Sequence, residues 1–292
     1  MEIKASMVKE LRDLTGAGMM DAKKALVEAE GDMERAQELL RQKGIASADK
    51  KMGRIAAEGL VGSVVEGKRG ALVEINCETD FVAKNEDFKA LLDKIAKVVL
   101  DTNPADVDAL NATSIDGTTV EEVVKAAIAK IGEKITIRRF ARYDDGNCVE
   151  SYIHNGKIGV LLEVKCLAEA NCDGSLAKDI CLHIASCAPE FVSRAEIPAE
   201  VIEEETRIEM GKEDLAKKPE AIRAKIVEGR VNKLMAQRCL LEQAFVKNPD
   251  VTIEGLVASK AEIVKFERYV LGEGLEKRNE NFADEVMNQI KG

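Results

Sequence analysis

One sequence pattern, Gly-Lys-x-Gly-x-Leu-x-Glu-x-x-Cys, occurs twice in the chain, at residues 67–77 and 156–166. Each copy follows a strand-like run and precedes a helical stretch, and each half then ends in Phe-x-Arg-Tyr, at residues 140–143 and 266–269. Strand, glycine turn, strand, helix and returning strand together predict an antiparallel sheet with helices on one face. Because the two copies lie much further apart than the repeats of a solenoid, we expect a duplicated α+β core.

Helical segments are expected before this core. Residues 1–45 contain three short helix-like stretches, the first two of which are separated by a turn with two glycines at residues 15–18. The third is expected over residues 33–43, with Asp32 as its N-cap and Gly44 just beyond its end. A unit of this size has little core of its own, which is typical of a docking module.

Two core subdomains and two further helical elements complete the predicted organisation. The subdomains are expected at residues 46–143 and 144–270, and a C-terminal module at residues 271–292. An insertion at about residues 197–245 has a proline at the start of each of two helical runs, which favours an antiparallel helical hairpin. Apolar side chains of its first arm are expected to face those of the second: Val201, Ile202 and Ile208 against Ile222, Ile226 and Leu234.

The charge and hydropathy of the chain argue against two kinds of partner. The 292 residues carry a formal net charge of −10, whereas binding to a nucleic-acid backbone depends on clustered Lys and Arg. No stretch approaches the roughly 18 apolar residues of a membrane span, and the charged N-terminus does not resemble a signal peptide. We therefore expect a cytoplasmic protein with no nucleic-acid or membrane partner.

Patterns for catalysis, nucleotide binding and metal binding are weak throughout. Residues 62–69 resemble a P-loop except at the last place, where Arg69 replaces the Ser or Thr that holds magnesium. The seven cysteines show no CxxC spacing, which argues against a zinc site. Of the two histidines, His183 lies in an apolar stretch typical of a core residue, and His154, beside a turn glycine, is expected to be exposed. We expect no enzyme, bound nucleotide, cofactor or metal.

The segment after the first copy, Thr-Asp-Phe-Val at residues 79–82, places an acid and a large aromatic side by side at the end of a strand. Aromatic residues make up only 3% of the chain and none is Trp, so this Phe is prominent. The strand before it alternates, with Ala71, Val73 and Ile75 on one side. Two interpretations stay open from the spacing: both side chains are presented at the rim for function, or Phe81 enters the core and Asp80 caps a helix.

Two segments together resemble the signatures of one family, translation elongation factor Ts: LRDLTGAGMMDAKKAL at residues 11–26 and EINCETDFVAK at residues 74–84. The resemblance covers essentially the whole chain. It implies an α+β protein with a UBA-like N-terminal module, the duplicated core, the hairpin and the C-terminal module. The implied activity is guanine-nucleotide exchange on elongation factor Tu, with no chemical catalysis. Ala22 stands where many members have Cys, which excludes a thiol role at that position.

The resemblance also assigns roles to residues of the loop at 79–82. Asp80 and Phe81, framed by Thr79 and Val82, are expected to enter the GTPase domain of elongation factor Tu near its magnesium ion and nucleotide. There they would disturb the site and promote GDP release.

Further contacts with the same partner are implied away from this loop. Met19 and Met20 are expected to contact the GTPase domain, with Arg12 also among the partner-binding residues. His154 is expected to contact the distal β-barrel domain of elongation factor Tu, and the last helix, around residues 282–290, to return to the GTPase domain.

Two rival functions remain compatible with the sequence. The first is a scaffold that binds a partner without altering its nucleotide state. The second is an enzyme that uses a thiol, for which Cys77, just before the acidic loop, is the candidate.

Overall fold

The computed structural model describes residues 3–168, 174–215 and 218–276. Small antiparallel sheets and helices make up these residues, which confirms the α+β class. Contacts within the chain divide it into two compact units. The first comprises Met1–Gly62, Val73–Phe140 and Tyr269–Gly292, and the second Ser63–Leu72 and Ala141–Arg268. The finer division into four parts, at residues 45, 143 and 270, stays a prediction.

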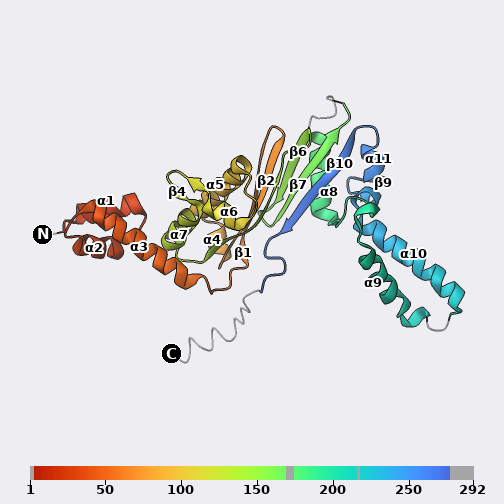
Figure 1. The fold of residues 1–292 in the computed structure, drawn as a ribbon, viewed down its shortest axis with the longest axis horizontal. Coiled ribbons are helices and arrows are strands. Elements are labelled where there is room, and N and C mark those ends of the chain that lie inside the picture. Colours follow the sequence, from red (N-terminus) through yellow and green to blue (C-terminus); the bar gives the residue numbers. More distant parts are fainter. Residues whose placement is uncertain (1–2, 169–173, 216–217, 277–292) are drawn as a thin grey trace. The chain divides into compact units, whose positions relative to one another are not determined.

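Three helices form the N-terminal part of the first unit, as predicted: α1 (Ala5–Thr15), α2 (Met19–Glu28) and α3 (Met33–Lys51) (Figure 1). Helix α1 ends at Gly16, which adopts a positive φ of 67°. Asp32 is the N-cap of α3, because its side chain accepts the backbone N–H of Arg35. The small core between these helices consists of Val8, Leu11, Ala22, Ala25, Leu26, Ala29 and Ala36.

The predicted end of the third helix is wrong. Helix α3 continues through Gly44 to Lys51, although a glycine inside a helix costs about 1 kcal/mol relative to alanine. The reason is tertiary packing against α7 (Val120–Ile131). A Cβ atom added to Gly44 would lie 3.0 Å from the Cβ of Ala129, so glycine permits the close approach of the two helices.

Two three-stranded sheets confirm the duplication. The first has the order β1 (Glu58–Glu66), β2 (Arg69–Cys77), β5 (Ile135–Tyr143), and the second β6 (Cys148–His154), β7 (Ile158–Cys166), β10 (Ala261–Val270). In both sheets the strand that carries the repeated pattern is therefore the central one. Strands β6 and β7 pair antiparallel from Cys148 opposite Val164 to His154 opposite Ile158. Gly67 and Gly156 adopt positive φ in the two connecting turns, as predicted for hairpin glycines.

Helices and short strands follow each sheet's central strand. In the first half these are α4 (Asp80–Ala83), α5 (Glu86–Thr102), α6 (Val107–Ala112), β3 (Ser114–Ile115), β4 (Thr118–Thr119) and α7. In the second they are α8 (Ser175–Cys187), α9 (Ala199–Met210), α10 (Glu220–Arg238), β8 (Ala244–Phe245), β9 (Asn248–Thr252) and α11 (Ile253–Val257). Among the described residues, 3₁₀ turns lie at Arg194–Glu196, Glu213–Leu215 and Leu240–Glu242.

Strand β2 is buried on both faces, not only on the side of Ala71, Val73 and Ile75. Every residue from Gly70 to Cys77 is buried. Helix α5 has an apolar face of buried residues that includes Phe88, Leu91, Leu92 and Ile95. A central strand with both faces buried is a rigid support for whatever follows its C-terminal end.

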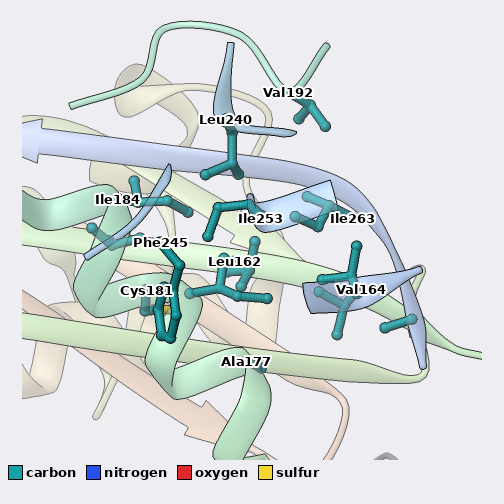
Figure 2. Packing of buried hydrophobic residues seen from close by; sticks show 14 of the residues in the cluster. Leu162, Val164, Ala177, Cys181, Ile184, Val192, Leu240, Phe245, Ile253 and Ile263 are labelled. Atoms are coloured by element: carbon teal, nitrogen blue, oxygen red, sulfur yellow. The ribbon is translucent and has the colours of Figure 1, made fainter. Parts of the chain in front are cut away.

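The second unit has its own core between α8, β7 and β10 (Figure 2). Figure 2 shows Ala177, Cys181 and Ile184 of α8 gathered with Leu162 of β7 and Ile263 of β10. His183 is a buried core histidine, as predicted. Its Nε2–H donates to Gln243 Oε1 at 2.8 Å, and its Nδ1 accepts the N–H of Val246 at 3.2 Å.

The repeated glutamate of the pattern is fully buried in both copies. In the first, Glu74 accepts hydrogen bonds from Arg138 at 2.9 Å, Arg139 at 2.7 Å and the backbone N–H of Gly272 at 2.9 Å. In the second, Glu163 forms an ion pair at 3.2 Å with Lys265. A buried carboxylate needs such partners, because an unpaired charge in the core is strongly destabilising.

The inserted hairpin is present, since α9 packs against α10 (Figure 1). The prediction of its facing residues is partly wrong. Val201, Ile226 and Leu234 join its core, but Ile202, Ile208 and Ile222 are exposed. On α9, the buried stripe runs through Val201 and Glu209, whose carboxylate pairs with Lys212 and Arg230, and the two isoleucines fall on either side of that stripe.

In the part of the chain that the structure describes, no helix combines the length and apolar character needed to cross a membrane.

Candidate functional site

The loop at residues 79–82 is a single helical turn at the end of the buried strand β2. Thr79 is the N-cap of α4, because its Oγ1 accepts the backbone N–H of Val82 at 3.3 Å. Asn85 then caps α5 in the same way through the N–H of Asp87 at 2.8 Å. Two capped helix starts in so few residues fix the path of the backbone between them.

Phe81 lies at the surface, with 80% of its side chain exposed, whereas its neighbour Val82 is buried. The core interpretation of Phe81 is therefore wrong. Asp80 does not cap the helix either, since Thr79 holds that position. In the described part of the chain, no other large apolar side chain is as exposed as Phe81, which favours a contact surface at this loop.

Asp80 and Phe81 share a neighbour, Lys84, one turn further along. The Lys84 ammonium donates to the Asp80 carboxylate at 2.6 Å and lies 5.7 Å from the centroid of the Phe81 ring. Both contacts are solvent-exposed, so they restrain the two side chains without binding them tightly. The Asp80 carboxylate and the Phe81 ring therefore lie side by side at the surface.

Glu133, just beyond the end of α7, binds the start of the loop through hydrogen bonds. Its Oε2 accepts the backbone N–H groups of Glu78 at 3.1 Å and Thr79 at 3.0 Å, and its Oε1 accepts the Thr79 hydroxyl at 2.7 Å. In return, Glu78 Oε1 accepts the backbone N–H of Lys134 at 2.7 Å and a bond from Arg54 at 3.1 Å. No sequence pattern predicted this contact, because it joins residues far apart in the chain.

Cys77, the candidate nucleophile of the thiol-enzyme hypothesis, is fully buried at the end of β2. Burial, and next the nearby Glu133 carboxylate, raise the pKa of its thiol to about 12. Its Sγ donates to the carbonyl of Thr79 at 3.1 Å. Since the thiolate is the reactive species, a protonated, buried Cys77 is unsuited to nucleophilic attack.

The N-terminal helices carry further exposed apolar side chains. At the start of α2, Met19 is 51% and Met20 63% exposed, and Leu14 and Val27 are exposed nearby in the chain. Arg12 pairs with its neighbour Asp13 at 2.9 Å. The predicted exposure of the two methionines is confirmed. These helices and the loop at residues 79–82 belong to the same compact unit.

His154 lies in the second unit, exposed at the end of β6. Its Nδ1 is 3.0 Å from the hydroxyl of Tyr152, and its Nε2 is 3.4 Å from the side-chain nitrogen of Asn155. The fourth predicted contact region, residues 282–290, lies outside the described residues. Among the described residues, no group of three or more His, Cys, Asp or Glu side chains is arranged to hold a metal ion.

Comparison of the sequence with known proteins identifies a family. The family model described as Elongation factor TS matches residues 78–273. A curated protein named Elongation factor Ts from Chromobacterium violaceum is 50% identical over 291 residues, covering 99% of both chains. Another of that name, from Alkalilimnicola ehrlichii, is 48% identical over 296 residues, covering both chains fully.

The chain belongs to the elongation factor Ts family. It is therefore a translation elongation factor and, in general terms, a nucleotide-exchange factor for elongation factor Tu. The family model begins at Glu78, at the loop that carries Phe81.

Proposed function

We propose that the Asp80–Phe81 loop is the element that weakens GDP binding by elongation factor Tu, by entering the partner beside its magnesium ion and nucleotide phosphates. The observation that carries the proposal is the exposure of Phe81, 80% of whose side chain is accessible on a turn capped by Thr79. A ring that is so exposed, on a turn capped by Thr79, contributes little to the core of this chain. It suits insertion into a partner.

The physical basis is that bound GDP is held largely by magnesium and by backbone donors around its phosphates. A contact that disturbs the magnesium ion or the phosphate-binding backbone therefore weakens GDP binding more than a contact elsewhere on the nucleotide would. The Phe81 ring acts as a wedge that displaces a packed element of the partner, and the Asp80 charge alters the electrostatics around the cation. Neither step requires a covalent bond to form or break.

Other surfaces supply the binding energy that stabilises the strained complex. In this proposal Met19, Met20 and Arg12 bind the GTPase domain, as do residues 282–290, and His154 binds the distal β-barrel domain. The exposure of both methionines and of His154 supports these assignments. Because translation elongation takes place in the cytoplasm, the proposal includes a cytoplasmic location.

The test is stopped-flow release of a fluorescent GDP from elongation factor Tu. Wild-type protein is expected to accelerate release, and Phe81→Ala to slow the accelerated release more than tenfold, because truncating an interface anchor costs about 2–4 kcal/mol. Thermal stability is expected to change little. The matched control is Leu167→Ala, since Leu167 is also exposed (58%) and follows the end of the equivalent strand β7.

Two results would contradict the proposal. If Phe81→Ala releases GDP at the wild-type rate, the exchange activity lies elsewhere, with the N-terminal helices as the next candidate. If wild-type protein binds the partner but leaves GDP release unchanged, the chain is a scaffold.

A further inference from the structure

The contact between Glu133 and the start of the loop is reciprocal. The Glu133 carboxylate accepts three hydrogen bonds from Glu78 and Thr79, while the Glu78 carboxylate accepts the N–H of Lys134 and pairs with Arg54. Hydrogen bonds to a carboxylate are roughly twice as strong as those between neutral groups. We refer to this pair of contacts, between residues 78–79 and 133–134, as the carboxylate clamp.

The clamp acts on Phe81 through the Thr79 hydroxyl. That hydroxyl has one hydrogen, which it donates to Glu133, and its oxygen is thereby oriented to accept the N–H of Val82. Helix α4 has only 4 residues, and a helix so short is unstable without its cap and its surroundings. The direction in which the Phe81 side chain points therefore depends on the Thr79 cap. The geometry of that cap depends in turn on Glu133.

The second copy joins the equivalent positions by a different contact. Counting along the shared patterns, Leu167 corresponds to Glu78, and Lys260 to Lys134. There the backbone N–H of Leu167 donates to the backbone carbonyl of Lys260 at 2.9 Å. At this position the second copy therefore uses a bond between two backbone groups, whereas in the first copy the backbone N–H of Glu78 donates to the Glu133 carboxylate. This difference at equivalent positions supports a role for Glu133 in holding the loop that follows β2.

We propose that Glu133 is a positioning residue for nucleotide exchange: it holds the Thr79 cap so that Phe81 is presented in its active direction before the partner binds. The inference rests on the proposed function of Phe81. Preorganising a binding element lowers the ordering cost of binding. For Phe81, the ordering cost is lowered for the step in which the ring enters the partner.

The first test separates the maximal rate of GDP release from the protein concentration that gives half of it. With Glu133→Ala, we expect the maximal stimulated rate to fall about five- to tenfold, since small misplacements of an active group cost up to about 100-fold. The half-saturating concentration is expected to change less than about twofold, because the other contact surfaces are intact. Glu133→Gln retains one acceptor oxygen for the loop N–H groups but loses the acceptor of the Thr79 hydroxyl, so its maximal rate is expected to lie between those of wild type and Glu133→Ala.

A double variant tests whether Glu133 acts through Phe81. Adding Glu133→Ala to Phe81→Ala is expected to slow release no further, because the ring that Glu133 positions is already gone. If the two effects multiply, Glu133 acts by another route and the inference is wrong. A wild-type maximal rate for Glu133→Ala would overturn it equally.

Amide hydrogen exchange of the isolated protein tests the clamp without the partner. Glu133→Ala is expected to exchange faster over residues 78–84 and to match wild type over residues 156–166, the repeated pattern of the second copy. Unchanged protection at residues 78–84 would overturn the inference even if the proposed function holds. Conversely, if wild-type protein fails to accelerate GDP release while this protection falls as expected, the proposed function has failed and the clamp has not.

Discussion

The two copies of the repeated pattern build the same sheet but end in different loops. In both, the pattern begins at a turn glycine and continues along the central strand, and its glutamate is buried. After the strand, Cys77 is followed by Glu-Thr-Asp-Phe, whereas Cys166 is followed by Leu-Ala. The comparison shows that the shared residues are those that the sheet requires. The residues that we propose act on a partner lie just beyond the strand, where the two copies differ in sequence.

The buried glutamates differ in how completely they are paired. Burial raises the pKa of Glu74, but the Gly272 N–H, Arg138 and Arg139 more than offset it, so the pKa is lowered overall. In the second copy Glu163 faces Lys265. Burial lowers the pKa of Lys265, but Glu163 and, next, Asp145 together more than offset it, so the pKa is raised overall. Of the two buried carboxylates, Glu74 thus has more hydrogen-bond partners than Glu163.

Removing each glutamate would measure this difference. Glu74→Ala is expected to destabilise the protein by about 3–5 kcal/mol, because it leaves two arginines without their buried partner. Glu163→Ala is expected to cost less, about 1–3 kcal/mol, since Lys265 is partly exposed and can regain water. Urea unfolding of each variant provides the measurement.

A surface control accompanies the pair. Lys89→Ala removes the exposed bridge to Glu86 and is expected to change stability by about 0.5 kcal/mol or less. Equal losses for Glu74→Ala and Glu163→Ala would show that the two copies are held alike, and the comparison would fail.

A smaller effect is expected from pH, and it distinguishes the second copy from the first. The pKa of His183 is lowered by burial, only partly offset by its bond to Gln243. Its neutral form contributes stability that is fully present above the unfolded pKa of about 6.5 and is lost as pH falls below that value. Protonation would place a hydrogen on Nδ1 facing the N–H of Val246, where two donors oppose each other.

The measurement is urea unfolding between about pH 7 and pH 5, a window that lies above the ordinary glutamate pKa. Wild type is expected to lose stability across it, and His183→Asn, which cannot take up a proton, to lose less. Glu74, whose pKa is lowered from 4.5, is expected to act only at more acid pH. Identical slopes for wild type and His183→Asn would contradict the role assigned to His183.

Most of the architecture could be predicted because its signals are local. The repeated pattern, the turn glycines at 67 and 156, the Asp32 cap and the hairpin prolines each act within a few residues. The exposure of Phe81 was not determined by its spacing in the sequence, since an aromatic after a strand suits either the core or a rim. The resemblance to the family favoured the rim.

The rest depended on contacts between distant segments. Glu133 binds Thr79 across 54 residues, and nothing in the sequence near Glu133 distinguishes it from other acids at helix ends. Gly44 looked like the end of a helix but lies within one, because its missing side chain admits Ala129. The exposure of Ile202 and Ile208 likewise could not be predicted from nearby residues. Their place depends on a buried Glu209 that pairs with Arg230 of the other arm.

The central claim is that Phe81 discriminates between nucleotide states of the partner, and coupling between two affinities tests it most directly. Because coupling is reciprocal, wild-type protein is expected to bind nucleotide-free elongation factor Tu more tightly than the GDP-saturated form. Calorimetric titration gives both dissociation constants. A variant with Met19 and Met20 both changed to Ala is the control. It is expected to weaken the free energy of binding to both forms by the same amount, about 1–3 kcal/mol. The ratio of the two dissociation constants is therefore preserved.

Phe81→Ala is expected to reduce that ratio at least tenfold, chiefly by weakening binding to the nucleotide-free form. If Phe81→Ala instead weakens both affinities equally and leaves the ratio at its wild-type value, Phe81 is an ordinary interface anchor, and its proposed role in nucleotide exchange is contradicted.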